Sequence, residues 1–411
     1  SPPLRIEWLA RNHRHHSILD HLRNLCCNSC CNLYRRLHQS SVTMTQGSPS
    51  TFVFGLAVAG RAVATSLRER GAEVVVGDDK LTDEHRSFAQ SIGARVVDIA
   101  RDGELQRVMS SVSVLSPAPG VAENHGVIRS ARENGVSIQS EIEIAYRMEL
   151  LRSDGPRPMV AITGTDGKTT TTLMANAMLR SAGLRSEAVG NTEVPLIESL
   201  ATEAQAFAIE CSSFRLEHTE LFRAQASAWL NIAPDHLDWH SSYQKYFDAK
   251  AKMWANCLPT DVVVAPIEDV NICAVARASA ARVVTFGAAD GDYRVVGNEL
   301  CGPSGPIMNV SRMKRSLPHD VTNALAAAAV CIEGGLASAQ HVANALEHFE
   351  NAPHRIQFVA EMNGVRWFND SKATEVEPPV RSRTVENVDG GGGPPVRSNS
   401  SGNWARFGGA A

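Results

Sequence analysis

The stretch Met159-Val-Ala-Ile-Thr-Gly-Thr-Asp-Gly-Lys-Thr-Thr170 decides the fold of this chain of 411 residues. It begins as an apolar strand, passes through a turn with two glycines, Gly164 and Gly167, and leads into a helical pattern of apolar residues. In such a strand–turn–helix unit, backbone N–H groups of the turn and of the helix start face a phosphate. The stretch therefore predicts an α/β domain built around a phosphate-binding loop.

The side chains of this loop add the chemistry of a nucleoside triphosphate site. Lys168 is expected to neutralise the β and γ phosphates, and the Thr169 hydroxyl is expected to reach a magnesium ion. The general pattern G-x-x-x-x-G-K-[ST] would need glycine at position 162, where the chain has Ile162, so the loop is the variant G-T-x-G-K-T-T. The ATP-binding residues predicted here are Gly164, Thr165, Asp166, Gly167, Lys168, Thr169 and Thr170.

Strand and helix patterns alternate on both sides of the loop. An alternation from Thr51 to about Tyr146 predicts a parallel, doubly wound sheet. A polar segment with proline and glycine, residues 151–158, then separates it from a second α/β unit. We expect an N-terminal Rossmann-like domain over residues 51–150, a central ATP-binding domain over 157–350, and the start of a third, Rossmann-like domain over 351–374.

A second glycine turn, Gly55-Leu-Ala-Val-Ala-Gly60, follows the first predicted strand. It fits G-x-A-x-x-G, a pattern in which the backbone approaches a pyrophosphate at a helix start. Asp78, at the end of the next strand, stands near the usual place of a ribose-binding acid. Because Ala57 replaces the middle glycine, the pattern alone leaves three interpretations open: a nucleotide site, an NAD site, or a purely structural turn.

Bulk composition excludes several classes of function. The chain is 43% hydrophobic and 20% charged with a formal net charge of −4, which favours neither nucleic acid nor a membrane surface as a partner. No apolar run is long enough to span a bilayer. The N-terminus lacks the order of a secretory signal, and the nine cysteines fit free thiols in a reducing cytoplasm.

The two ends of the chain differ from the rest. Residues 1–43 precede Met44 and are expected to be a disordered or mis-annotated leader; a zinc site is the alternative, formed by Cys26, Cys27, Cys30 and Cys31 with His13, His15 and His16. Residues 375–411 are rich in proline, glycine, serine and arginine, a composition that predicts a disordered tail. The change of pattern after Thr374 is typical of a truncated or frameshifted gene.

The loop variant is typical of the Mur ligases and the folylpolyglutamate synthases, and further blocks resemble the D-glutamate-adding Mur ligases. The resemblance covers residues 51–374. These blocks, in the family's order, are Gly190-Asn-Thr, Ile209-Glu-Cys-Ser-Ser-Phe-Arg-Leu-Glu217, Asn231-Ile-Ala-Pro-Asp-His-Leu-Asp-Trp-His240, Phe247-Asp-Ala-Lys250, His319-Asp-Val-Thr-Asn323, Pro353-His-Arg355 and Phe368-Asn-Asp-Ser-Lys-Ala-Thr374.

Three of the residues in these blocks also have meaning without the resemblance. Glu210 ends an apolar strand, so its carboxylate is expected at the sheet edge where ligands bind. The alternative is that Glu210 is an ordinary surface charge. His236 follows Asp235, which fits a helix start capped by that aspartate. Lys250 fits a solvated helix face. The resemblance instead implies magnesium ligands at Glu210 and His236 and a carbamylated lysine at Lys250.

The resemblance implies a full set of site residues. Catalysis would involve Lys168, His236 and Lys250, with Thr169, Glu210, His236 and carbamylated Lys250 at magnesium. Further ATP contacts would come from Asn323, Arg355 and Asp370. Substrate contacts would come from Gly55, Gly60, Asp78, Ser116, Asn191, Thr192, Lys372 and Thr374. Because the family binds a uridine group in its first domain, the resemblance favours UDP over NAD at the Gly55 turn.

The implied reaction is ATP-dependent ligation of D-glutamate to UDP-N-acetylmuramoyl-L-alanine through an acyl phosphate, carried out by a cytoplasmic monomer. Since the pattern of the third domain ends at Thr374, we expect this chain to bind its nucleotides but to ligate poorly. Two alternatives remain at this point: a non-catalytic remnant that binds nucleotides or the UDP-sugar, and another ATP-dependent amide ligase such as a folylpolyglutamate synthase.

Overall fold

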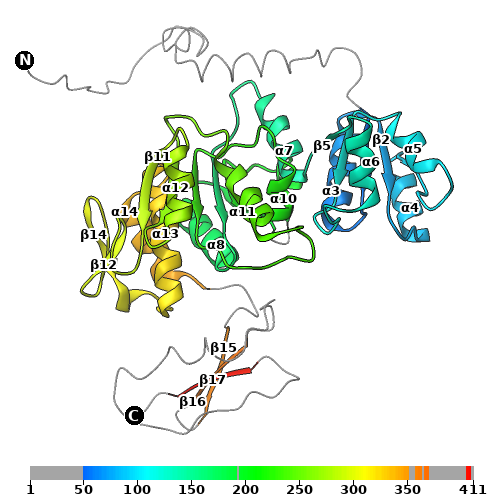
Figure 1. Cartoon of the computed structure of the whole chain (residues 1–411). Helices are drawn as coiled ribbons and strands as arrows, with labels where there is room; N and C mark the ends of the chain where they lie inside the picture. Colours follow the sequence, from blue (N-terminus) through cyan, green and yellow to red (C-terminus); the bar gives the residue numbers. More distant parts are fainter. Residues whose placement is uncertain (1–49, 192–193, 351–356, 363–364, 370–403, 409–411) are drawn as a thin grey trace, which may run out of the picture. The chain divides into compact units, whose positions relative to one another are not determined.

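The computed structural model describes residues 50–191, 194–350, 357–362, 365–369 and 404–408 (Figure 1). Its first sheet has five parallel strands in the order β3-β2-β1-β4-β5. The strands are β1 (Thr51–Phe54), β2 (Val74–Gly77), β3 (Arg95–Val96), β4 (Val114–Pro117) and β5 (Ser137–Ile138). The helices between them are α3 (Val58–Glu69), α4 (Asp83–Ser91), α5 (Glu104–Met109) and α6 (Gly126–Glu133).

Helices cover both faces of this sheet. Along β1, Val53 packs with Val63 of α3, whereas Phe52 packs on the opposite face with Met109 of α5 and Ile128 of α6. A strand buried on both faces has no polar positions to alternate with apolar ones, which explains the continuous apolar run of β1. The predicted doubly wound α/β architecture is confirmed.

The second sheet has six parallel strands in the order β11-β10-β9-β6-β8-β7. These are β6 (Met159–Thr163), β7 (Ser186–Gly190), β8 (Ala206–Glu210), β9 (Ala226–Trp229), β10 (Val262–Pro266) and β11 (Arg282–Phe286). Strand β6 lies between β8 and β9, and all three run in the same direction. The loop after β6 therefore shares one sheet edge with the residues that follow β8 and β9.

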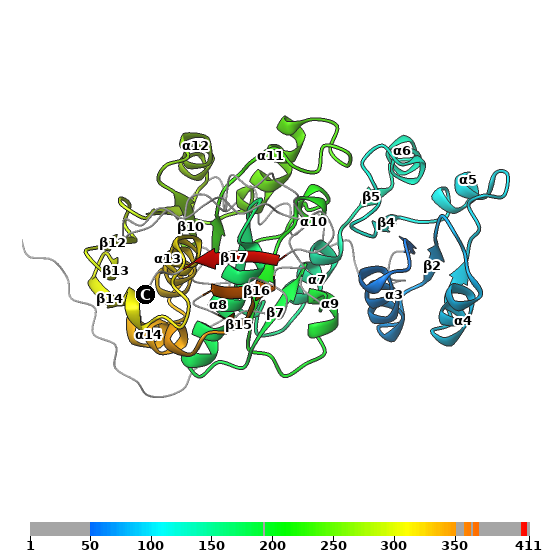
Figure 2. The same cartoon turned by 90° about the horizontal axis from the view of Figure 1, so that it is seen from below.

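Helices and short connections surround this sheet. The α-helices are α7 (Glu141–Leu150), α8 (Lys168–Ser181), α9 (Leu196–Ser199), α10 (Ser213–Glu217), α11 (Tyr243–Ala251), α12 (Val270–Ala278), α13 (Pro318–Glu333) and α14 (Ala339–His348). The 3₁₀ helices are η1 (Lys252–Trp254) and η2 (Val310–Arg312), and an antiparallel meander comprises β12 (Arg294–Val296), β13 (Glu299–Gly302) and β14 (Gly305–Asn309). Helix α8 packs against both α13 and α14 (Figure 2).

Helix α13 contains an alanine-rich run. Residues 324–331 of α13 are all buried. Their small side chains allow α13 to approach α8 closely, which fixes the helix that begins at the phosphate loop. Within the described residues, the first helix is α3, which begins at Val58 because the turn after β1 ends at Ala57.

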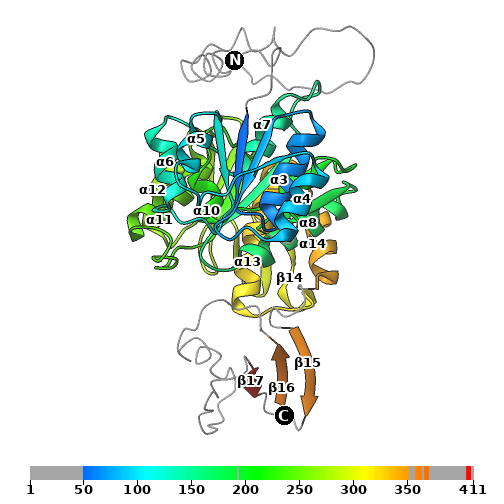
Figure 3. The ribbon, with the colours of Figure 1, turned by 90° about the vertical axis from the view of Figure 1, so that its right-hand side faces the viewer.

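A third, antiparallel sheet comprises β15 (Gln357–Met362), β16 (Val365–Asn369) and β17 (Trp404–Gly408) (Figure 3). Strand β17 pairs with β16, although it lies within residues 375–411, whose composition predicts a disordered tail. The domain boundaries stay predictions. The leader and zinc interpretations of residues 1–43 lie outside the described residues. Within the described part of the chain, none of the helices has the length and apolar character needed to traverse a bilayer.

Candidate active site

The glycines of the phosphate loop allow a close approach to α13. Gly167 has φ +78°, a left-handed conformation that favours glycine, and it caps the N-terminus of α8. A Cβ added there would lie 2.5 Å from Oδ1 of Asn323 on α13. The loop and Asn323, both predicted to bind ATP, are therefore in direct proximity.

Lys168 is the first residue of α8, and its side chain folds back over the loop. Its Nζ donates a hydrogen bond to the Thr165 carbonyl oxygen at 2.6 Å. The cation thus lies at the positive end of the helix dipole, where an anion is favoured. This arrangement suits a charged group that is to neutralise phosphate.

Glu210 joins two other predicted site residues at the carboxyl end of β8. Its side chain is 2% exposed, and its Oε2 accepts a hydrogen bond from the Thr169 hydroxyl at 2.8 Å. Its Oε1 accepts from Nδ2 of Asn191 at 3.2 Å. A Cβ on Gly190 would lie 2.4 Å from the Glu210 carbonyl oxygen, so only glycine lets β7 end this close to β8. The surface-charge interpretation of Glu210 is therefore wrong.

Lys250 is buried on the inner side of α11. Only 1% of the residue is exposed, and its Nζ donates to the Gly164 carbonyl oxygen at 2.7 Å. The Nζ also lies 4.5 Å from the ring centroid of Tyr246. Burial, together with the positive charge of Lys168, holds the pKa of Lys250 well below its usual range. The solvated-face interpretation of Lys250 is therefore wrong, and a neutral amine is accessible at this position.

His236 has an unusual backbone conformation for a non-glycine residue, with φ +53°. Its Nε2 lies 3.1 Å from Oδ2 of Asp235, and its ring is 4.8 Å from the ring of Phe214. Burial lowers the pKa of His236, which favours the neutral imidazole that ligates metals. No helix starts at Asp235: the next helix, α11, is capped by Ser242 instead.

Sequence reasoning missed two residues beside the loop, Asn231 and Tyr246. Asn231 follows β9, and its side-chain Oδ1 accepts hydrogen bonds from the backbone N–H groups of Thr165 and Asp166, both at 2.9 Å. The Tyr246 hydroxyl lies 3.0 Å from Oγ1 of Thr165. The available signal for Asn231 was a polar residue directly after a buried strand, at the sheet edge the loop occupies. No signal in the sequence distinguished Tyr246 from a core aromatic residue.

The first glycine turn is built on a different interaction. The N–H of Leu56 donates to Oδ2 of Asp78 at 2.8 Å. Gly55 has φ +92°, and a Cβ on Gly60 would lie 1.9 Å from the Gly55 carbonyl oxygen. Ser116 is buried on β4, in register with Val53 of β1. The turn between Gly55 and Gly60 at the end of β1 is thus bound by Asp78, which directly follows β2.

Other predicted site residues lie outside the described residues, and nothing is inferred about their positions. These residues are Thr192, Arg355, Asp370, Lys372 and Thr374.

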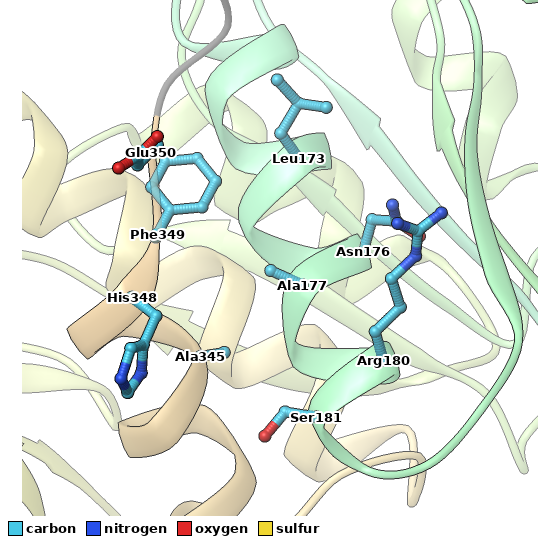
Figure 4. Close-up of a pocket in the computed structure, with 9 residues that line it drawn as sticks. All are labelled: Leu173, Asn176, Ala177, Arg180, Ser181, Ala345, His348, Phe349 and Glu350. Atoms are coloured by element: carbon cyan, nitrogen blue, oxygen red, sulfur yellow. The ribbon is translucent and has the colours of Figure 1, made fainter.

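A groove of about 630 Å³ lies between α8 and α14, and no predicted site residue lines it (Figure 4). Its walls come from the later turns of α8, such as Leu173 and Ala177, and from the end of α14, such as His348. Because α8 begins at Lys168, the groove is displaced along the helix from the phosphate loop.

Comparisons with known proteins match this architecture. The family model of the Mur ligase middle domain matches residues 162–331. The chain is similar in fold to a crystal structure of UDP-N-acetylmuramate:L-alanyl-gamma-D-glutamyl-meso-diaminopimelate ligase from Neisseria meningitides, with a TM-score of 0.52 and 16% identity over 74% of this chain and 99% of that one. This chain belongs to the Mur ligases, which are ATP-dependent enzymes that form amide bonds.

Individual relatives show to which kind of Mur ligase the chain belongs. The UDP-N-acetylmuramoylalanine--D-glutamate ligase of Frankia casuarinae is 34% identical over 78% of this chain and 69% of its own length. The enzyme of the same name from Geotalea uraniireducens is 36% identical over 82% of this chain and 75% of its own length. Within the Mur ligases, the chain belongs to the UDP-N-acetylmuramoylalanine--D-glutamate ligase family.

Proposed function

We propose that this chain joins D-glutamate to UDP-N-acetylmuramoyl-L-alanine at the expense of ATP, in the cytoplasm. The observation that carries the proposal is the convergence of Lys168, Thr169, Glu210 and Lys250 on one glycine loop. A triphosphate needs donors and cations, and a magnesium ion needs a hard oxygen; this loop offers all three.

The loop binds and orients ATP in this proposal. The N-terminus of α8 points its first N–H groups out of the helix end, a geometry that suits phosphate oxygens. Lys168 spreads the charge that develops as the L-alanine carboxylate attacks the γ-phosphorus and ADP leaves. Asn323, which adjoins Gly167, contributes to holding the nucleotide.

The product of that step is an acyl phosphate. The amine of D-glutamate then attacks its carbonyl carbon, an amide bond forms, and phosphate leaves while the amine loses a proton. No covalent bond to the protein is required. Consistently, burial raises the pKa of the Cys211 thiol beside Glu210, so this cysteine is a poor nucleophile.

We propose that a magnesium ion binds at the loop beside Glu210 and the Thr169 hydroxyl. Mg²⁺ is usually held by one or two carboxylates together with substrate phosphates and water. Glu210 supplies a carboxylate hydrogen-bonded to the Thr169 hydroxyl, and His236 supplies a neutral imidazole. Lys250 would add an oxygen donor once carbon dioxide has added to its neutral amine, as its lowered pKa allows. The metal would supply neutralisation of phosphate charge.

The first glycine turn is proposed to take the uridine end of the substrate, with Asn191 contacting the muramoyl part. The support is the turn between Gly55 and Gly60 at the end of β1, which Asp78 binds from the end of β2, at the sheet edge where parallel sheets bind ligands. Ser116, one strand away, belongs to the same proposal.

Phosphate release and calorimetry together test this function. We expect release of phosphate from ATP and magnesium to require both UDP-N-acetylmuramoyl-L-alanine and D-glutamate, with L-glutamate as the matched control. Calorimetry should detect both the UDP-sugar and a non-hydrolysable ATP analogue. If both ligands bind but D-glutamate never stimulates release, the chain is a nucleotide-binding member without ligase activity; if neither binds, the proposal is wrong.

A further inference from the structure

Two segments far apart in the sequence are hydrogen-bonded to each other at the edge of the second sheet. One is the phosphate loop at residues 164–166, and the other is the segment 231–233 after β9. The N–H of Thr165 donates to two oxygens of Asn231, the carbonyl oxygen at 3.2 Å and Oδ1 at 2.9 Å. The N–H of Asp166 donates to the same Oδ1 at 2.9 Å. In return, Nδ2 of Asn231 donates to the Asp166 carbonyl oxygen at 3.2 Å.

The hydrogen-bond pattern requires an amide at position 231. Two N–H donors face Oδ1, and one carbonyl acceptor faces Nδ2, so both ends of the amide are satisfied in one orientation only. A carboxylate would accept the two N–H groups equally well. It would, however, lose the donor to the Asp166 carbonyl oxygen and place a negative charge beside a loop that binds phosphate.

The Thr165 side chain extends this link to the other catalytic elements. Its Oγ1 accepts a hydrogen bond from the N–H of Ala233 at 2.9 Å, three residues before His236. The same Oγ1 lies 3.0 Å from the hydroxyl of Tyr246, whose ring adjoins Lys250 at 4.5 Å. Thr165 is 6% exposed, so these contacts are buried. The position of the loop is thereby tied to the two elements that carry His236 and Lys250.

We propose that Asn231 is a positioning residue for the nucleotide: its amide fixes the backbone of the phosphate loop, and its segment sets the distance from the loop to His236. Asn231 acts through the loop and does not touch ATP. In this arrangement the N–H groups of Thr165 and Asp166 donate to Asn231 and not to phosphate. The phosphate groups are therefore bound at the start of α8. The inference rests on the proposed binding of ATP at this loop.

Three variants separate this role from general stability. Asn231→Ala removes all the side-chain bonds to the loop, and Asn231→Asp keeps the acceptor but removes the donor. Asn256→Ala is the matched control, because Asn256 is a partly exposed asparagine whose Nδ2 donates to the carbonyl oxygens of Glu220 and Phe222, away from the loop. Each protein is compared in its full-length form, and its unfolding midpoint confirms that it is folded at the temperature used.

The first measurement is the affinity for the magnesium complex of a non-hydrolysable ATP analogue, by calorimetry. We expect Asn231→Ala to weaken it by at least about tenfold, the order expected for loss of the hydrogen bonds that shape the loop. Asn231→Asp should weaken it further because of its charge. Affinity for UDP-N-acetylmuramoyl-L-alanine should not change in either variant, and Asn256→Ala should match the original chain in both measurements.

The second measurement is amide hydrogen exchange in the peptide that contains residues 164–167, without nucleotide. Exchange should be faster in Asn231→Ala and unchanged in Asn256→Ala. Unchanged exchange in a folded Asn231→Ala, or faster exchange with unaltered affinity for the analogue, overturns the role of Asn231 alone. Absence of analogue binding by the original chain overturns the proposed function instead, and with it the role given to Asn231.

Discussion

The two glycine turns of this chain have the same backbone design and opposite chemistry. Each follows the central strand of a parallel sheet, leads into a helix, and has an N–H group of the turn bound by a side chain from a neighbouring strand's end. At the first turn that side chain is the carboxylate of Asp78; at the second it is the neutral amide of Asn231. Lysines 168 and 250 also converge on the second turn.

The difference supports the proposal that each turn holds a different part of the substrates. The phosphates of ATP need cations and N–H donors. A turn with two lysines that is held by the uncharged amide of Asn231 therefore suits them. A turn held by a carboxylate offers an acceptor for hydroxyl or N–H donors, which sugars and uracil possess. Backbone geometry alone does not discriminate between the two ligands. Three experiments separate the turns by their side chains or their packing, and a fourth tests the sheet that carries the second turn.

Replacing Lys168 should have the largest effect on activity, and the effect should be confined to the second turn. For Lys168→Ala we expect phosphate release to fall by at least on the order of a hundredfold, because a preorganised charge at the transferring phosphoryl group is removed. Affinity for the UDP-sugar should be unchanged. Lys314→Ala, which removes an exposed lysine, is the control. Equal losses in the two variants, or a loss of UDP-sugar affinity in Lys168→Ala, would contradict the assignment of the turns.

Alanine at Gly60 should destabilise the fold more than alanine at Gly167. The new Cβ of Gly60→Ala meets backbone, the Gly55 carbonyl oxygen at 1.9 Å, whereas that of Gly167→Ala meets the side chain of Asn323 at 2.5 Å. We expect losses in the free energy of unfolding of about 3 kcal/mol or more for Gly60→Ala and about 1–2 kcal/mol for Gly167→Ala, measured by urea denaturation.

Two further glycines calibrate that comparison. Gly71→Ala has open space around the new Cβ but φ +80°, so it measures backbone strain alone, and Gly120→Ala has neither problem. Gly60→Ala must therefore be less stable than Gly71→Ala, and Gly120→Ala should be near neutral. A Gly60→Ala protein as stable as Gly120→Ala would show that the first turn is wider than described.

How far the sequence predicted these turns depends on the range of the interactions. The strand–glycine–helix order is local, so both turns, the doubly wound fold and the loop residues were predictable from spacing. The burial of Lys250 was not, because Asp-Ala-Lys-Ala-Lys has no apolar pattern and the contact with Gly164 spans 86 positions. Asn231 and Tyr246 reach Thr165 over 66 and 81 positions. Such contacts follow from strand order, which local patterns do not contain.

Acid should affect the second sheet through a buried histidine. Burial lowers the pKa of His218, which follows α10, to about 3, against 6.5 in the unfolded chain. Between these values the unfolded state binds more protons, so the free energy of unfolding decreases as pH falls below 6.5. The decrease approaches its full size near pH 3 and is up to about 5 kcal/mol for this one group.

Tryptophan fluorescence follows this effect without a contribution from the first sheet, and variants with Trp8, Trp367 and Trp404 replaced by Phe leave only the signal of the second sheet. Residues 51–150 contain no tryptophan, whereas Trp229, Trp239 and Trp254 are buried around the second sheet. In urea titrations between pH 7 and pH 4, His218→Gln should lose less stability than the original chain, and His348→Gln, at an exposed histidine, should follow the original chain. A pH dependence identical in His218→Gln and the original chain would exclude His218 as the cause.

The smallest expected effect tests the carboxylate of the first turn. Asp78→Asn keeps an acceptor for the N–H of Leu56 and removes only the charge, so the turn should remain folded. If the carboxylate also accepts from the uridine group, affinity for UDP-N-acetylmuramoyl-L-alanine should fall by roughly three- to tenfold, the size expected for weakening one charge-assisted hydrogen bond. Affinity for the ATP analogue should be unchanged. A variant that loses both affinities to the same extent would mean that the two turns do not hold separate ligands, and tighter binding of NAD than of the UDP-sugar would return the first turn to its dinucleotide interpretation.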